Sequence, residues 1–113
     1  MAALARVWLC TEECSFVLAE RLTALSIRSP EGGPLTRMPD GDVRICVRTG
    51  DAPEAAVATC AGHLAPGLLA DLARILTDAA DYPEPCAFVH LVRTEAGTLK
   101  WTISGTPPEN WPG

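Results

Sequence analysis

The clearest hydrophobic pattern lies in residues 66–80, PGLLADLARILTDAA. Leucine and isoleucine recur there at the spacings that place side chains along one face of an α-helix, and charged residues fall on the opposite side. Proline is tolerated in the first turn of a helix, and Pro83 prevents continuation past Tyr82. The pattern therefore predicts one long amphipathic helix over residues 66–80, which needs a hydrophobic surface to cover.

Alternation of apolar and polar residues predicts strands in much of the remaining chain. In residues 42–49, DVRICVRT, the apolar Val and Ile residues face one side, and the two arginines and Cys46 face the other. The PDG before this strand and the TGDAPE after it are turn signals. Residues 55–59, AAVAT, can then return antiparallel before the helix.

A β-hairpin is predicted for residues 86–104, CAFVHLVRTEAGTLKWTIS. Gly97 suits the left-handed third position of a three-residue loop, which fixes the pairing of the two strands. In this register Leu91 lies beside Trp101, and His90 points to the other face as a hydrogen-bonded, half-exposed residue. A two-residue loop would exchange the faces, because a slip of one residue turns every side chain over.

The N-terminal third admits two interpretations. Residues 5–10, ARVWLC, alternate like a strand, whereas residues 15–25, SFVLAERLTAL, fit either a helix or a long strand after a loop at 11–15. Short connections and the strand-rich remainder favour the strand. Residues 29–42 are rich in proline and glycine, which is typical of a long loop that moves or binds something.

Together these elements predict an α+β fold. We expect an antiparallel sheet of about four to six strands, with the long amphipathic helix packed on one face. The 113 residues fit one domain, which we place at 1–104, followed by an extended tail at 105–113. Hydrophobic residues make up 48% of the chain, enough for a core without disulfide or metal support.

Charge narrows the range of partners. The chain has 9 Lys and Arg against 14 Asp and Glu, and its net charge is -5. Phosphate binding needs clustered cations, and these are spread along the sequence, so neither nucleic acid nor an anionic membrane is expected as a partner. The N-terminal MAALARVWLC lacks the features of a signal peptide. We therefore expect a cytoplasmic protein with reduced thiols, and the composition is typical of a GC-rich bacterial genome.

Two close pairs of cysteine and histidine suggest a metal site as an alternative. Cys10 and Cys14 form one pair, and Cys60 and His63 form the other. Two such pairs can complete the tetrahedron of a structural zinc ion. However, cysteine is equally common as a buried core residue, and CTEEC lacks the glycine turn of a zinc knuckle. We therefore expect no cofactor, with a Cys3His zinc site as the alternative.

Cys46 is a candidate for a reactive or redox-sensing thiol. On its strand it shares a face with Arg44 and Arg48, whose guanidinium groups would favour the thiolate. A nucleophile also needs a base, and neither His63 nor His90 lies in a catalytic motif. The sequence contains no catalytic constellation that we can identify, so a non-enzymatic protein is expected.

The few aromatic residues point to an interaction surface. Trp8 and Phe88 fall on strand faces opposite the predicted helix, so the sheet is apolar on both sides and needs a second cover. With Trp101 they are the candidate interaction residues. We expect a small protein-interaction or regulatory module that binds a protein partner or itself, and the sequence points to no particular small molecule.

Overall fold

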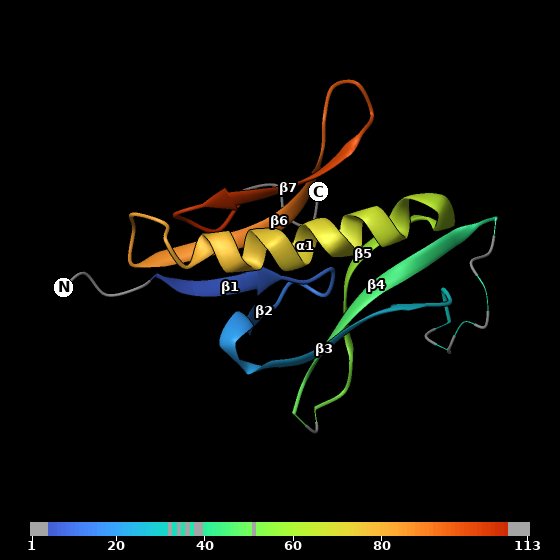
Figure 1. The fold of residues 1–113 in the computed structure, drawn as a ribbon, viewed down its shortest axis with the longest axis horizontal. Coiled ribbons are helices and arrows are strands. Elements are labelled where there is room, and N and C mark those ends of the chain that lie inside the picture. Colours follow the sequence, from blue (N-terminus) through green and yellow to red (C-terminus); the bar gives the residue numbers. More distant parts are fainter. Residues whose placement is uncertain are drawn as a thin grey trace.

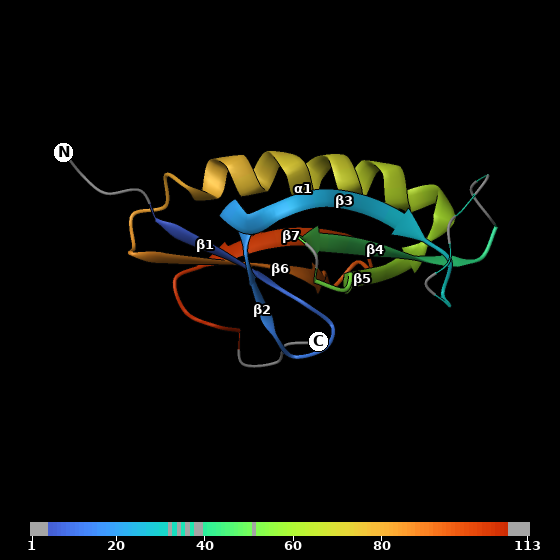
Figure 2. The same ribbon diagram turned by 90° about the horizontal axis from the view of Figure 1, so that it is seen from below.

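The computed structural model describes residues 5–31, 33, 35, 37, 40–50 and 52–108. Within them the elements follow one another as β1 (Arg6–Cys10), β2 (Phe16–Leu18), the 3₁₀ helix η1 (Ala19–Arg21), β3 (Leu22–Arg28), β4 (Asp42–Thr49), β5 (Ala55–Ala61), the 3₁₀ helix η2 (Gly62–Leu64), α1 (Ala65–Ala79), β6 (Cys86–Arg93) and β7 (Leu99–Ser104). The strands form one layer, and α1 lies across it as the second layer (Figure 1, Figure 2).

The α+β class and the single long helix are confirmed, but the predicted single sheet is two sheets. A four-stranded sheet has the order β2-β1-β6-β7, and a three-stranded sheet has the order β3-β4-β5. The larger sheet is mixed, because β1 and β6 run parallel. Parallel pairing requires a long crossover, which here contains everything from β2 to α1. The division arises at η1, where the chain leaves one sheet and enters the other.

The helix α1 bridges the two sheets. It packs against β3 and β4 of the smaller sheet and against β6 and β7 of the larger one. Its buried residues include Leu68 and Leu72, and fully burying a leucine contributes about 1.5–3 kcal/mol. The indole Nε1–H of Trp101 donates a hydrogen bond of 2.8 Å to the carbonyl oxygen of Leu68, which fixes β7 beneath the helix.

The β1–β2 loop links the larger sheet to β5 of the smaller sheet through hydrogen bonds of Glu12. The Glu12 N–H donates to the carbonyl of Ala56 at 2.8 Å, and the Thr59 hydroxyl donates to the Glu12 carboxylate at 2.8 Å. The β4–β5 pairing shifts register beside Ala56. Such an irregularity bends a strand and interrupts its ladder, which allows a segment from the neighbouring sheet to bond there.

The N-terminal third is built of strands rather than an α-helix, but the predicted long strand is divided into two that belong to different sheets. Residues 16–18 and 22–28 are strands separated by η1, and residues 11–15 form the loop before them. The Thr11 hydroxyl oxygen accepts hydrogen bonds from the backbone N–H groups of Glu13 (3.2 Å) and Ser15 (3.3 Å). This local bonding closes the loop and allows β2 to pair antiparallel with β1.

The hairpin register is also confirmed. Gly97 has a φ of 83°, the Thr94 N–H donates to the Thr98 carbonyl at 2.8 Å, and Leu91 lies opposite Trp101. His90 is buried rather than half-exposed, because only 8% of the residue is exposed. Its Nδ1 has no partner among the described residues. Burial is the main cause of its lowered pKa, and a backbone hydrogen bond with Phe88 acts in the opposite direction.

Parts of two predictions lie outside the described residues. They are residues 32, 34, 36, 38 and 39 of the predicted loop and residues 109–113 of the predicted tail. The last strand ends at Ser104. Among the helices that the structure describes, none has the length and apolar character needed to cross a membrane.

Candidate functional site

The strand layer has one covered face and one face that α1 does not cover. Side chains alternate along β4, so Val43, Ile45 and Val47 join the core beneath α1. Arg44 and Cys46 consequently point to the opposite face. That face carries a hollow on the smaller sheet and a group of aromatic side chains on the larger sheet.

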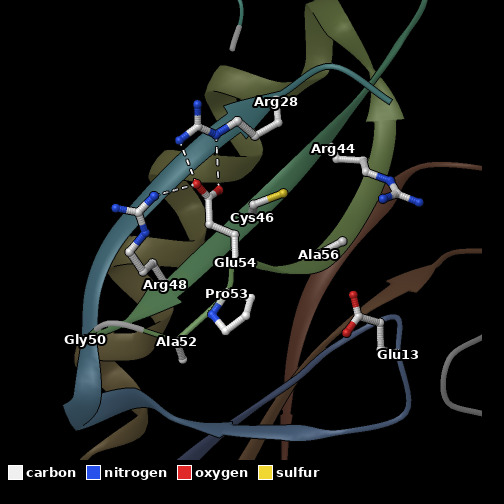
Figure 3. Close-up of a pocket in the computed structure, with 10 residues that line it drawn as sticks. All are labelled: Glu13, Arg28, Arg44, Cys46, Arg48, Gly50, Ala52, Pro53, Glu54 and Ala56. Atoms are coloured by element: carbon white, nitrogen blue, oxygen red, sulfur yellow. Dashed lines mark hydrogen bonds and ion pairs between the residues drawn. The ribbon is translucent and has the colours of Figure 1, made fainter. Parts of the chain in front are cut away.

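The hollow, which we call the arginine pocket, has a volume of about 510 Å³. Its walls come from β3, β4, β5, the β4–β5 connection and the tip of the β1–β2 loop (Figure 3). Small residues line part of it, and its polar and ionisable lining residues are Glu13, Arg28, Arg44, Cys46, Arg48 and Glu54.

A carboxylate already occupies one end of the arginine pocket. Arg28 holds Glu54 through two bonds, Nε to Oε2 at 3.1 Å and Nη2 to Oε1 at 2.7 Å. Arg48 Nη2 donates to the same Oε1 at 2.9 Å, and the Ser26 hydroxyl donates to Oε2 at 3.2 Å. The bond from Arg28 is the main reason that the pKa of Glu54 is lowered, although burial opposes it. Glu54 is therefore an ionised carboxylate at neutral pH.

Arg44 differs from the other two arginines. Its guanidinium makes no hydrogen bond or ion pair within the described part of the chain, although it lines the same pocket (Figure 3). It also lies directly opposite Arg28 in the β3–β4 register. Like charges at directly opposite positions destabilise a sheet. The pocket thus contains one arginine to which no carboxylate of the described residues is bonded.

Cys46 lies beside these arginines but lacks the properties of an activated thiol. It is 5% exposed. Burial raises its pKa, Glu54 raises it further, and Arg44 and Arg28 act in the opposite direction. The arginines therefore do not produce the low pKa that a reactive cysteine requires, because burial dominates and Glu54 offsets their charge.

The four residues considered as zinc ligands are not brought together. Cys60 belongs to the core beneath α1, whereas Cys10 pairs with Phe16 in the other sheet. Cys14 and His63 are exposed in a loop and in η2. Burial raises the pKa of Cys10 to about 11. In the described ranges, no group of three or more His, Cys, Asp and Glu side chains could hold a metal ion.

The aromatic cluster on the larger sheet consists of Trp8, Phe16 and Phe88. Trp8 lies opposite Phe88 in the parallel pairing of β1 and β6, and both are half-buried. The rings of Phe16 and Phe88 have centroids 5.2 Å apart at an angle of 58°. Trp101 does not join this cluster. It is 5% exposed and lies in the core beneath α1. The register that pairs Trp101 with Leu91 places its side chain on the face covered by the helix, away from the aromatic cluster.

Sequence reasoning missed four residues of these surfaces: Glu13, Arg28 and Glu54 of the pocket, and Phe16 of the aromatic cluster. Arg28 and Glu54 share a pocket with Arg44 only because of the β3–β4 register and the β4–β5 connection, and no short sequence motif predicts either. Phe16 would have followed from an explicit β1–β2 register, which places it opposite Cys10.

A scan against protein-family models, a search of curated proteins and a search of solved structures each find no match.

Proposed function

We propose that this chain is a small protein-interaction module that associates through the face of the strand layer opposite α1. The observation that supports this most directly is the aromatic cluster. Its three side chains lie on the face that the only α-helix of the described residues leaves uncovered. Phe16 is 40% exposed. Aromatic residues are enriched at protein interfaces, because they bury large apolar areas with few rotatable bonds.

A second copy of the chain is the partner that we propose first. A twofold axis would bring the aromatic cluster of one copy against that of the other, so each would complete the missing cover. Sheets that are apolar on both faces are normally covered on both. Self-association would provide this cover without any other component.

Two exposed apolar residues offer a matched test. Phe16 is 40% exposed within the cluster, and Leu64 is 43% exposed in η2, outside it. Sedimentation velocity over a range of concentrations should show mass increasing for the wild type and for Leu64→Arg, but a monomer for Phe16→Arg. A buried arginine without a partner is costly, so only the variant in the interface should dissociate.

Two outcomes would count against self-association. The first is a monomeric wild type at every concentration. The second is identical behaviour of the two variants, because the cluster would then have no special part in assembly. Circular dichroism of each variant establishes that its fold is retained.

A further inference from the structure

We propose that the arginine pocket binds a carboxylate group of a ligand, with Arg44 as the residue that holds it. This site is separate from the aromatic cluster and does not depend on self-association. The pocket volume of about 510 Å³ lies within the range of small-ligand sites, about 300–1,000 Å³. Its position beside the β4–β5 connection leaves it open to solvent on the face away from α1.

The structure itself shows how a carboxylate is held in this pocket. Glu54 receives a two-bond contact from Arg28 and a further bond from Arg48. Paired N–H donors of a guanidinium match the two oxygens of a carboxylate, which makes such contacts strong and oriented. Arg44 presents the same group to the same pocket, but no carboxylate is bonded to it.

The cross-strand position of Arg44 explains why an anion would be favoured there. Arg44 lies directly opposite Arg28, and Glu54 bonds Arg28 but not Arg44. An anion on Arg44 would remove the repulsion that remains between the two guanidinium groups. Ligand binding would therefore stabilise the smaller sheet as well as occupy the pocket.

The charge balance favours a carboxylate over a phosphate. Three arginines against two glutamates, Glu13 and Glu54, leave a formal charge of +1 in the pocket. One carboxylate neutralises this charge, whereas a phosphate dianion would leave it negative in a chain whose net charge is already -5. The carboxylate can belong to a free organic acid or to an acidic side chain of another protein, because both present the same group.

The experiment follows the backbone amide signals of Cys46 and Ala56 by NMR during titration, because both residues line the pocket and remain in every variant. The probes are butyrate, the peptide acetyl-Gly-Glu-Gly-amide, its glutamine counterpart and inorganic phosphate. Saturable shifts with butyrate or with the glutamate peptide, and none with the glutamine peptide, are expected. Tighter binding of butyrate would identify a small organic acid as the better ligand, and tighter binding of the peptide an acidic side chain. Phosphate should bind more weakly than either.

Two arginine variants show whether the effect belongs to the pocket. Arg44→Gln should weaken binding about tenfold or more, because hydrogen bonds to charged groups contribute about 1.5–3 kcal/mol each. Arg74→Gln is the matched control. Arg74 lies on α1, is 75% exposed and pairs only with Asp71 within the described residues, so its replacement should leave binding unchanged.

Glu13→Gln provides a change in the opposite direction. It removes one negative charge from the pocket lining, so carboxylate binding should become tighter. Arg44→Lys keeps the charge but loses the paired donors, and should bind between the wild type and Arg44→Gln. The proposal fails if no probe saturates, if phosphate binds as tightly as butyrate, or if Arg44→Gln and Arg74→Gln bind equally well.

Discussion

At the scale of single residues, Glu54 connects parts of the smaller sheet that are distant in sequence. It precedes β5 but bonds Arg28 on β3 and Arg48 on β4. Its side chain is 22% exposed, so solvent screens the ion pairs and limits their contribution. The lowered pKa nevertheless fixes the direction in which stability depends on pH.

Replacing Glu54 with glutamine should flatten that dependence in acid. The pKa of Glu54 is below its ordinary value of 4.5 in the folded protein. The unfolded chain therefore takes up the proton first, and the stability from this group is lost as the pH falls through the folded pKa. Urea unfolding between about pH 5 and pH 3 should show a smaller loss of unfolding free energy for Glu54→Gln than for the wild type. Equal losses would contradict this assignment.

Two glycines should respond oppositely to replacement by alanine. Gly97 has a φ of 83° in the hairpin loop, where a side chain is strained, and Gly97→Ala should lower the unfolding free energy by about 1 kcal/mol. Gly67 lies in the first turn of α1, and a Cβ added there would meet no atom within 4 Å. Gly67→Ala should raise the unfolding free energy by about 0.4–1 kcal/mol. Urea denaturation measures the unfolding free energy of both variants. If both substitutions changed it in the same direction, the backbone conformation of the two glycines would not explain their effects.

At the scale of elements, the sequence predicts those whose signals are local. The spacing of Leu68, Leu72 and Ile75 predicts α1, and Gly97 predicts the hairpin register. The parallel pairing of β1 with β6 was not predictable in this way, because it joins residues about eighty positions apart. The residues of the arginine pocket show the same contrast between local and tertiary signals. The shared face of Arg44 and Cys46 follows from alternation, whereas the contact of Arg28 with Glu54 depends on tertiary structure.

The core position of α1 leads to a prediction with an internal control. Leu72 is 0% exposed on α1, which packs against both sheets, whereas Leu64 is 43% exposed just before the helix. Leu72→Ala should lower the unfolding free energy by about 2–5 kcal/mol, because it removes buried contacts and leaves a cavity. Leu64→Ala should change it by less than about 0.5 kcal/mol. Chemical denaturation of the two variants makes the comparison, and equal losses would show that α1 does not pack as described.

At the scale of the whole molecule, the chain is asymmetric. One face of its strand layer is covered by α1 (Figure 2). The opposite face carries the aromatic cluster and the arginine pocket. Three of the nine Lys and Arg of an acidic chain line that pocket. We propose that this uncovered face is the contact surface of the protein.

Two tryptophans report on the two faces. Trp101 is in the core beneath α1, with its indole N–H bonded to Leu68, and Trp8 is half-buried on the opposite face. The most direct test is broadening of the two indole signals by a soluble gadolinium chelate, in dilute and in concentrated protein. We predict that Trp101 stays protected throughout, and that Trp8 is broadened when dilute and protected when concentrated. A Trp8 signal whose protection does not change with concentration would contradict the account.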